Sequence, residues 1–179
     1  TEFEGGWGFC VITQDAYEAF EPGDIRRDVA VLNLDTYQEE MMNRGIAVNY
    51  TGRYQNTGYF LRKYLGRPGG KADQAGDADL NWETNFHLYR YAETLLVAAE
   101  LAWRTNSGEA QGYFDQIRER AGLSPKAISE EAIMQERRVE LLGEGKRYFD
   151  LIRFGKAAEV LKPGGGAIYV TKDAHRFVC

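Results

Sequence analysis

The sequence has few of the residues from which disulfide frameworks and metal sites are built. Its 179 residues include two cysteines and two histidines. Cys10 and Cys179 stand near opposite ends without CxxC spacing, so they form neither a metal framework nor a disulfide scaffold, and whether they pair stays open. His87 and His175 are far apart and are not spaced with a cysteine for metal binding. We expect both to be ordinary surface or hydrogen-bonded histidines.

The sequence also lacks an excess of positive charge and a long apolar run. It has 22 Lys and Arg against 27 Asp and Glu, a formal net charge of −5. Because nucleic-acid binding requires a concentrated basic face, this balance argues against a nucleic-acid partner. No apolar run approaches the roughly 20 residues of a membrane-spanning helix. The 44% hydrophobic and 27% charged residues are typical of a globular protein, and the length is enough for one domain.

The pattern of residues changes near position 85. Residues 1–85 are rich in Gly, Asn, Asp and Tyr, and they predict short helices over 14–20 and 36–44 and a strand around 59–65. From residue 86 onward, apolar residues recur at steps of three and four, as on one face of a helix. The helices predicted in this second half span residues 86–104, 109–121, 130–142 and 146–161.

These patterns predict a mainly α fold. Short connections between the helices favour antiparallel helix pairs, of the size found in tetratricopeptide-type repeats, although the usual residues of that repeat are not obvious here. Residues 86–179 form the helical part. Residues 1–85 form an irregular, loop-rich part of the same domain, with a few short strands and a possible ligand surface.

One segment, ERRVELLGEGKRYFDLIRFGKA over residues 136–157, combines ten ionised side chains with many residues typical of a core. Glu136, Glu140 and Glu144 recur every four residues and so share a helix face. The helix that follows is apolar nearly all round, so we expect it to be buried with its charges paired. Arginine suits such pairs because its planar fork meets a carboxylate with two hydrogen bonds. The predicted structural ion-pair network comprises Glu136, Arg137, Glu140, Glu144, Arg147, Asp150 and Arg153.

The alternative role for these carboxylates is acid and base catalysis, as in glycoside hydrolases. Each carboxylate has a basic neighbour at helical spacing, which lowers its pKa and makes it a poor general acid. A glycoside hydrolase would need a carboxyl pair free of basic neighbours. We therefore predict no catalytic residue among these carboxylates.

The charged segment resembles the pattern E-R-R-x-E-L-x-x-E-G-x-R-x-x-D-L-x-R-W-G, found near the C-terminal end of proteins of the SusD/RagB family. Phe154 stands where that family usually has Trp. Residues 88–124 are similar to the family's R-Y-A-E-x-L-L-x-x-A-E helix and to the next helix, which ends in R-x-R-A-G-L. Residues 13–29 resemble its threonine-led short helix and D-x-R turn. The resemblance covers nearly the whole chain.

The resemblance implies a SusD-like fold and a function in nutrient uptake. Members of the family are far longer, so we expect this chain to correspond to their C-terminal portion. The family's N-terminal helices, export signal and lipidated cysteine then lie outside it. A family member would be a cell-surface lipoprotein of the outer membrane, anchored through an N-terminal region not present in this chain. It would not be an enzyme: it would capture an oligosaccharide and pass it to a TonB-dependent, SusC-like transporter, with no bond made or broken and without a cofactor.

A helical-repeat module that binds protein and no sugar is the alternative from a different class. The aromatic, Asn- and Asp-rich first half favours glycan capture, since a pure scaffold would not need it. We also expect residues 1–179 alone to be marginally stable or to associate, because the third and fourth helices carry apolar faces that would meet the missing helices.

Sugar capture requires flat aromatic faces beside amide groups that bond to hydroxyls. Trp7 and Trp82 are flanked by glycine or polar residues, without the apolar periodicity of a core helix. Core packing is the alternative role for each aromatic residue, and we predict it for Trp103, which lies on a helical stripe. The predicted ligand-binding residues are Trp7, Tyr50, Tyr54, Asn81 and Trp82.

A possible calcium loop begins at Asp77, where Asp77, Asp79 and Asn81 place oxygen donors at positions one, three and five. The sixth position is Trp82, where an EF-hand needs glycine, and the twelfth is Leu88, which cannot ligate. These two residues exclude an EF-hand. We predict no metal site, and a looser calcium site is the alternative.

Overall fold

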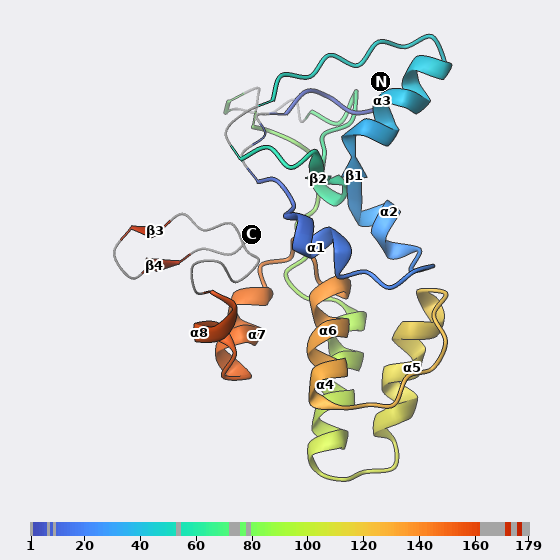
Figure 1. Cartoon of the computed structure of the whole chain (residues 1–179), viewed down its shortest axis with the longest axis vertical. Helices are drawn as coiled ribbons and strands as arrows, with labels where there is room; N and C mark the ends of the chain where they lie inside the picture. The colour runs from blue at the N-terminus through green and yellow to red at the C-terminus, as the bar shows by residue number, and fades with distance from the viewer. Residues whose placement is uncertain are drawn as a thin grey trace.

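The computed structural model describes residues 2–6, 8, 10–52, 55–71, 76–77, 80–161, 171–172 and 175–176. Figure 1 shows α4, α5 and α6 standing together, with α7 and α8 beside them and the loop-rich part, with α3, β1 and β2, at the other end of the molecule. Within these described ranges, no helix has the length and apolar character needed to cross a membrane.

The helical part is built on α4 (Tyr91–Arg104), α5 (Ala110–Arg120) and α6 (Glu130–Glu140). A short turn joins α4 to α5, and the two helices run antiparallel (Figure 1). Arg104 at the end of α4 pairs with Glu130 at the start of α6, at 3.2 Å. Arg90, just before α4, pairs with Glu140 at the end of α6, at 2.5 Å. These two pairs show that α4 and α6 also run antiparallel.

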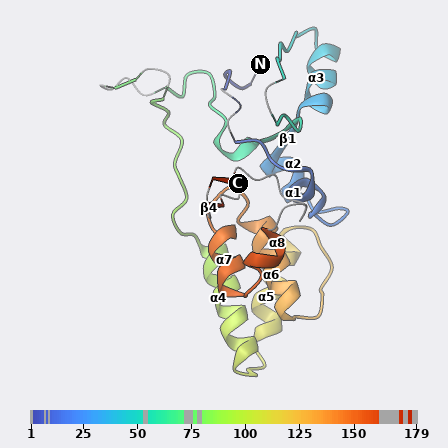
Figure 2. The same cartoon turned by 60° about the vertical axis from the view of Figure 1, so that its left-hand side comes forward.

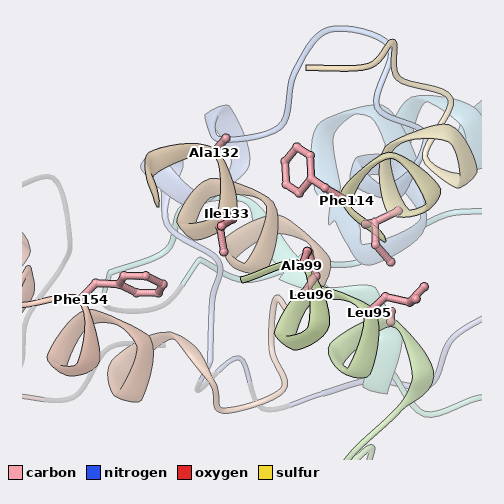
Figure 3. Packing of buried hydrophobic residues seen from close by; sticks show 9 residues of the cluster. Leu95, Leu96, Ala99, Phe114, Ala132, Ile133 and Phe154 are labelled. Carbon is pink, nitrogen blue, oxygen red and sulfur yellow. The ribbon is translucent and has the colours of Figure 1, made fainter. Parts of the chain in front are cut away.

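The core of this part lies where the three helices meet, and Phe154 packs on it from the end of α7 (Figure 3). The stripe predicted on α4 is buried at Ala92, Leu95, Ala99 and Ala102. Leu88, at the start of the predicted stripe, is 76% exposed because the helix begins three residues later. Burial of each large apolar side chain here contributes about 1.5–3 kcal/mol.

The loop-rich part contains α1 (Gln14–Glu18), α2 (Arg26–Ala30), α3 (Leu34–Asn43) and the short 3-10 helix η1 (Arg62–Tyr64). Strands β1 (Val31–Asn33) and β2 (Tyr59–Leu61) pair antiparallel, with Val31 opposite Leu61. The last two strands, β3 (Thr171–Lys172) and β4 (His175–Arg176), have two residues each and pair antiparallel. The sequence predicted α1 and α3 but not α2, and the strand predicted over 59–65 ends at Leu61, where η1 begins.

A second apolar cluster joins the two parts of the chain. Ile12, Phe20 and Val31 of the loop-rich part are buried against Val139 and Leu142 at the end of α6. The two parts therefore share one core. Because α2, β1 and α6 meet in this core, residues near the start of the chain lie close to the charged segment.

The fourth predicted helix differs from the structure in two ways. It is two helices, α7 (Arg147–Arg153) and α8 (Ala157–Val160), separated at Gly155, whose φ is +68°. Figure 2 shows both lying beside α4 and α6. The expectation that this segment is buried all round is wrong. Leu151 is buried, but Phe149 is 69% exposed and Ile152 is 51% exposed, because α7 packs with one face only.

Gly143 ends α6 under two constraints, and its replacement tests both. Its φ is +78°, and an added Cβ would overlap the side chain of Leu61. We expect Gly143→Ala to lose about 1–2 kcal/mol from the left-handed backbone and a further 1–3 kcal/mol, roughly, from overpacking. Gly145→Ala is the matched control, since Gly145 has φ +72° but open space around it. Urea unfolding that gave equal losses for both variants would contradict the packing against Leu61.

The exposed face of α7 predicts association of residues 1–179 when they are produced alone. Large exposed apolar patches mark interaction surfaces. We expect light scattering to show species larger than a monomer, and Phe149→Ser with Ile152→Ser to reduce them without lowering the melting temperature. Val29→Ser, a 68% exposed apolar residue on α2, is the control and should leave association unchanged. A cooperative, monomeric melt of the unaltered chain would disprove the expectation.

Candidate functional site

The carboxylates of the charged segment, which were the candidates for catalysis, are buried in ion pairs. Glu136, Glu140 and Glu144 are 2%, 3% and 4% exposed. Arg26 on α2 joins Glu136 at 2.6 Å and Glu140 at 2.9 Å. Arg90 joins Glu140 at 2.5 Å and Glu144 at 2.9 Å. Glu144 lies beyond the end of α6, yet the turn at Gly143 brings it back to the same arginine.

Arg137 makes a different set of contacts from those expected of a neighbour of Glu140. Its Nε donates to both oxygens of Asp150, at 2.9 Å each, and its side chain also approaches Glu93 at 3.7 Å. Arg153 pairs with the same Asp150 at 3.0 Å and with Glu100 of α4. Asp150 thus fastens α7 to α6, which is the helix-to-helix contact that the sequence predicted.

Arg147 differs from the other members of the predicted network. Among the described residues, no carboxylate forms an ion pair with it. Burial, together with the nearby guanidinium of Arg138, lowers the pKa of Arg147 to about 10. The structure therefore does not place Arg147 in the network.

The electrostatics around Glu140 and Glu144 exclude these two carboxylates as general acids. Burial raises the pKa of Glu140, but hydrogen bonds from Arg26 and Arg90 outweigh burial and lower the pKa to about 2. Burial likewise raises the pKa of Glu144, and hydrogen bonds from Arg90 and Lys63 bring it below its ordinary value. Carboxylates that hold their negative charge so firmly cannot donate a proton near neutral pH.

A pocket of about 800 Å³ lies in the loop-rich part, within the usual range for small-ligand sites, about 300–1,000 Å³. Its walls come from four segments of the described chain: residues 3–6 with Gly8 and Cys10, residues 32–37, residues 47–51 and residues 60–65. We call it the Tyr50 pocket. Its aromatic lining residues are Phe3, Tyr37, Tyr50, Phe60 and Tyr64, with Asn49 beside Tyr50.

Tyr50 is held at both ends of its ring. Its hydroxyl donates to the Oδ1 atom of Asn56 at 2.5 Å, and the same oxygen accepts a hydrogen bond from the backbone amide of Gly58 at 3.0 Å. The ring meets Phe60 edge-on, with centroids 5.7 Å apart. Tyr50 is also 37% exposed, so part of this held aromatic residue stays accessible where it lines the pocket.

The structure separates the residues that the sequence proposed for ligand binding. Tyr50 lines the pocket. Trp82 instead covers Gly66, where an added Cβ would come within 2.6 Å of its ring, and Lys71 lies over the same ring at 5.2 Å. Asn81 packs beside Gly76, in the loop that leads to Trp82. Trp7 and Tyr54 lie outside the described residues, so their role stays a prediction.

Sequence reasoning missed most of the pocket's aromatic wall. Tyr37 lies on α3 and Phe60 on β2, and neither stands in a motif. The abundance of tyrosine in residues 1–85 is the signal that could have pointed to Tyr37, and no comparable signal marks Phe60. Trp103, predicted as a core residue, is partly buried against the helical cluster.

The possible calcium loop has no ligand cluster in the described part of the chain. No group of three or more His, Cys, Asp or Glu side chains there could hold a metal ion. Asp79 and the side chain of His175 lie outside the described residues. Cys10 is exposed and free, and Cys179 also lies outside the described residues.

The chain matches the model of the SusD family over residues 2–173, and it belongs to that family. It is 30% identical over 190 residues to SusD-like protein P2 of Formosa agariphila, an alignment that covers 98% of this chain and 37% of that protein. The chain therefore spans little more than a third of this relative's length. The mainly α, SusD-like fold predicted from the sequence is confirmed.

Two solved structures are similar to this one. Surface glycan-binding protein A from Bacteroides thetaiotaomicron, in complex with laminarihexaose, has a TM-score of 0.83 and 42% identity, over 90% of this chain and 35% of that chain. A laminarin binding SusD-like protein has a TM-score of 0.76 and 38% identity, over 89% of this chain and 33% of that chain.

Acid unfolding tests the buried role of Glu140. Its pKa is lowered on folding, so its contribution to stability is present above the ordinary value of 4.5 and is lost as the pH falls toward about 2. The shift corresponds to about 3 kcal/mol. We expect the free energy of unfolding to fall steeply between pH 5 and pH 2, roughly the interval that the two pKa values define, and Glu140→Gln to flatten that dependence.

Glu131→Gln, at an exposed glutamate on the same helix, is the matched control and should keep the slope of the unaltered protein. Glu140→Gln should also be less stable at neutral pH by about 3–5 kcal/mol, because it removes the buried carboxylate from its pairs with the partly buried Arg26 and Arg90. A slope that is the same in both variants would show that Glu140 does not titrate in this window.

Proposed function

We propose that this chain is part of a cell-surface protein that binds an oligosaccharide and passes it to a TonB-dependent outer-membrane transporter. The observation that carries the proposal is the 42% identity, with a TM-score of 0.83, to a glycan-binding protein whose solved structure holds laminarihexaose. The aromatic Tyr50 pocket supports it, because pyranose rings bind to flat aromatic faces.

The two parts of the chain have different tasks in this proposal. Residues 1–85 provide the ligand surface, with the Tyr50 pocket at its centre and Trp7, Tyr54, Asn81 and Trp82 as further candidates. Residues 86–179 provide the scaffold that fixes the loops. Loops held on a rigid scaffold are the usual place for ligand contacts.

The protein makes and breaks no bond in this proposal. The buried carboxylates that were considered for acid and base catalysis are paired with arginine, and the pKa of Glu140 lies at about 2. Neither a cofactor nor a metal is required for capture and release of a sugar.

Location and partner follow from the same proposal. The protein is held at the outer membrane by a lipid anchor in a region that precedes this chain, and its partner is a SusC-like transporter. The pocket favours this reading over a helical module that binds only protein, since an aromatic-walled cavity has no task in such a module.

Tyr50→Ala tests the proposed ligand surface. We expect calorimetry on the full-length protein, with laminarihexaose and maltohexaose as probes, to show binding that the variant weakens about tenfold, a loss of about 1.4 kcal/mol for one aromatic face. Tyr89→Ala is the control, because Tyr89 is 61% exposed and lies outside the pocket lining. No binding to any glycan in a wider panel would overturn the proposal, and release of shorter sugars would show an enzyme instead.

A further inference from the structure

One wall of the Tyr50 pocket is bare backbone. Gly5 and Gly6 both line the pocket. The residues before them are fixed: Phe3 is 8% exposed in a cluster with Tyr37 and Met41, and the backbone amide of Glu4 donates to the carbonyl of Gly66 at 2.9 Å. The glycine pair therefore begins from a secured position on the rim.

The fold itself does not require glycine at these two positions. Neither residue has a positive φ, and a Cβ added at either would meet no atom of the described residues within 4 Å. Other glycines show what a structural reason looks like. Gly8 on the same segment has φ +69°, and Gly143 combines φ +78° with a close side chain. Gly5 and Gly6 share neither feature.

Absence of a Cβ has a further use, which is close approach of the backbone to a ligand. It also exposes amide and carbonyl groups, which bond to hydroxyls. Tyr50, fixed by Asn56, lines the same pocket with an aromatic face. A flat ring with polar edges fits a space that offers an aromatic face and a bare backbone.

We propose that Gly5 and Gly6 are ligand-contact residues, and that the pocket holds one sugar ring of an uncharged glycan between their backbone and Tyr50. The described lining contains Glu4 but no lysine or arginine, which disfavours sulfated or uronic sugars. This inference rests on the proposed function and names the contact residues and the sugar class.

The test uses Gly5→Ala and Gly6→Ala in the full-length protein. A methyl group on the wall should displace the sugar ring and weaken laminarihexaose or maltohexaose binding about tenfold or more. The melting temperature should stay unchanged or rise by about 1–3 °C, because alanine restricts the unfolded chain. Gly112→Ala is the matched control: Gly112 also has open space and no positive φ, but it lies on α5, and its replacement should leave binding unchanged.

The outcomes separate this inference from the proposed function. If Tyr50→Ala weakens binding while Gly5→Ala and Gly6→Ala bind as the unaltered protein does, the proposed contact of the sugar with Gly5 and Gly6 is wrong. The proposed glycan binding then still stands. If an oligomer of uronic acids binds more tightly than either neutral hexasaccharide, the uncharged class is wrong. If the unaltered protein binds none of these sugars, the proposed function and this inference fall together. If Gly5→Ala and Gly6→Ala weaken glycan binding and Gly112→Ala does not, the inference is supported.

Discussion

The meeting of Arg90 with Glu140 and Glu144 is the contact on which the rest of the structure depends. Arg90 precedes α4, Glu140 ends α6, and Glu144 lies in the turn toward α7. One guanidinium therefore joins the start of α4, the end of α6 and the turn that leads to α7. Arg26 adds α2 to the same group through Glu140, so the loop-rich part is fastened at the same point.

Burial of so many charges is costly unless each has a partner, and this cost explains the density of the network. Moving an isolated ionised group out of water costs roughly several kcal/mol of free energy. Each buried glutamate here has at least two basic partners. Glu136, for example, meets Arg26 and Arg118 at 2.6 and 3.0 Å. The same pairing holds the pKa of Glu140 and Glu144 below the ordinary value, so the contacts that join the helices also keep these two carboxylates ionised.

The fold was largely predictable from the sequence, because apolar residues recur every three or four positions along a helix and this spacing is visible among neighbouring residues. Ala92, Leu95 and Ala99 revealed α4, and the glycines after Glu140 revealed the end of α6. The partners of the buried glutamates were not predictable in this way. Lys63 is 81 residues from Glu144 and Arg26 is 114 residues from Glu140, and helical spacing carries no information over such separations.

The candidate site was less predictable than the fold. Tyr50 and Trp82 were both proposed from residue type and loop setting; Tyr50 lines the pocket and Trp82 covers Gly66, and the ligand-binding role of each stays a prediction. Residue type shows which side chains can stack on a ligand, and only the path of the loops shows which of them share a cavity. The exposure of α7 was also misjudged, since an apolar sequence does not state whether the covering surface belongs to this chain.

The four-segment wall of the Tyr50 pocket has a mechanical consequence. Segments that are distant in the sequence become neighbours there, so a bound molecule would act as a reversible crosslink that restrains them together. Loading would stiffen the loops, and unloading would require them to part. In the proposed function, the lifetime of the bound sugar therefore depends on how often these loops separate, and a contact that pulls one segment aside would speed release of the sugar.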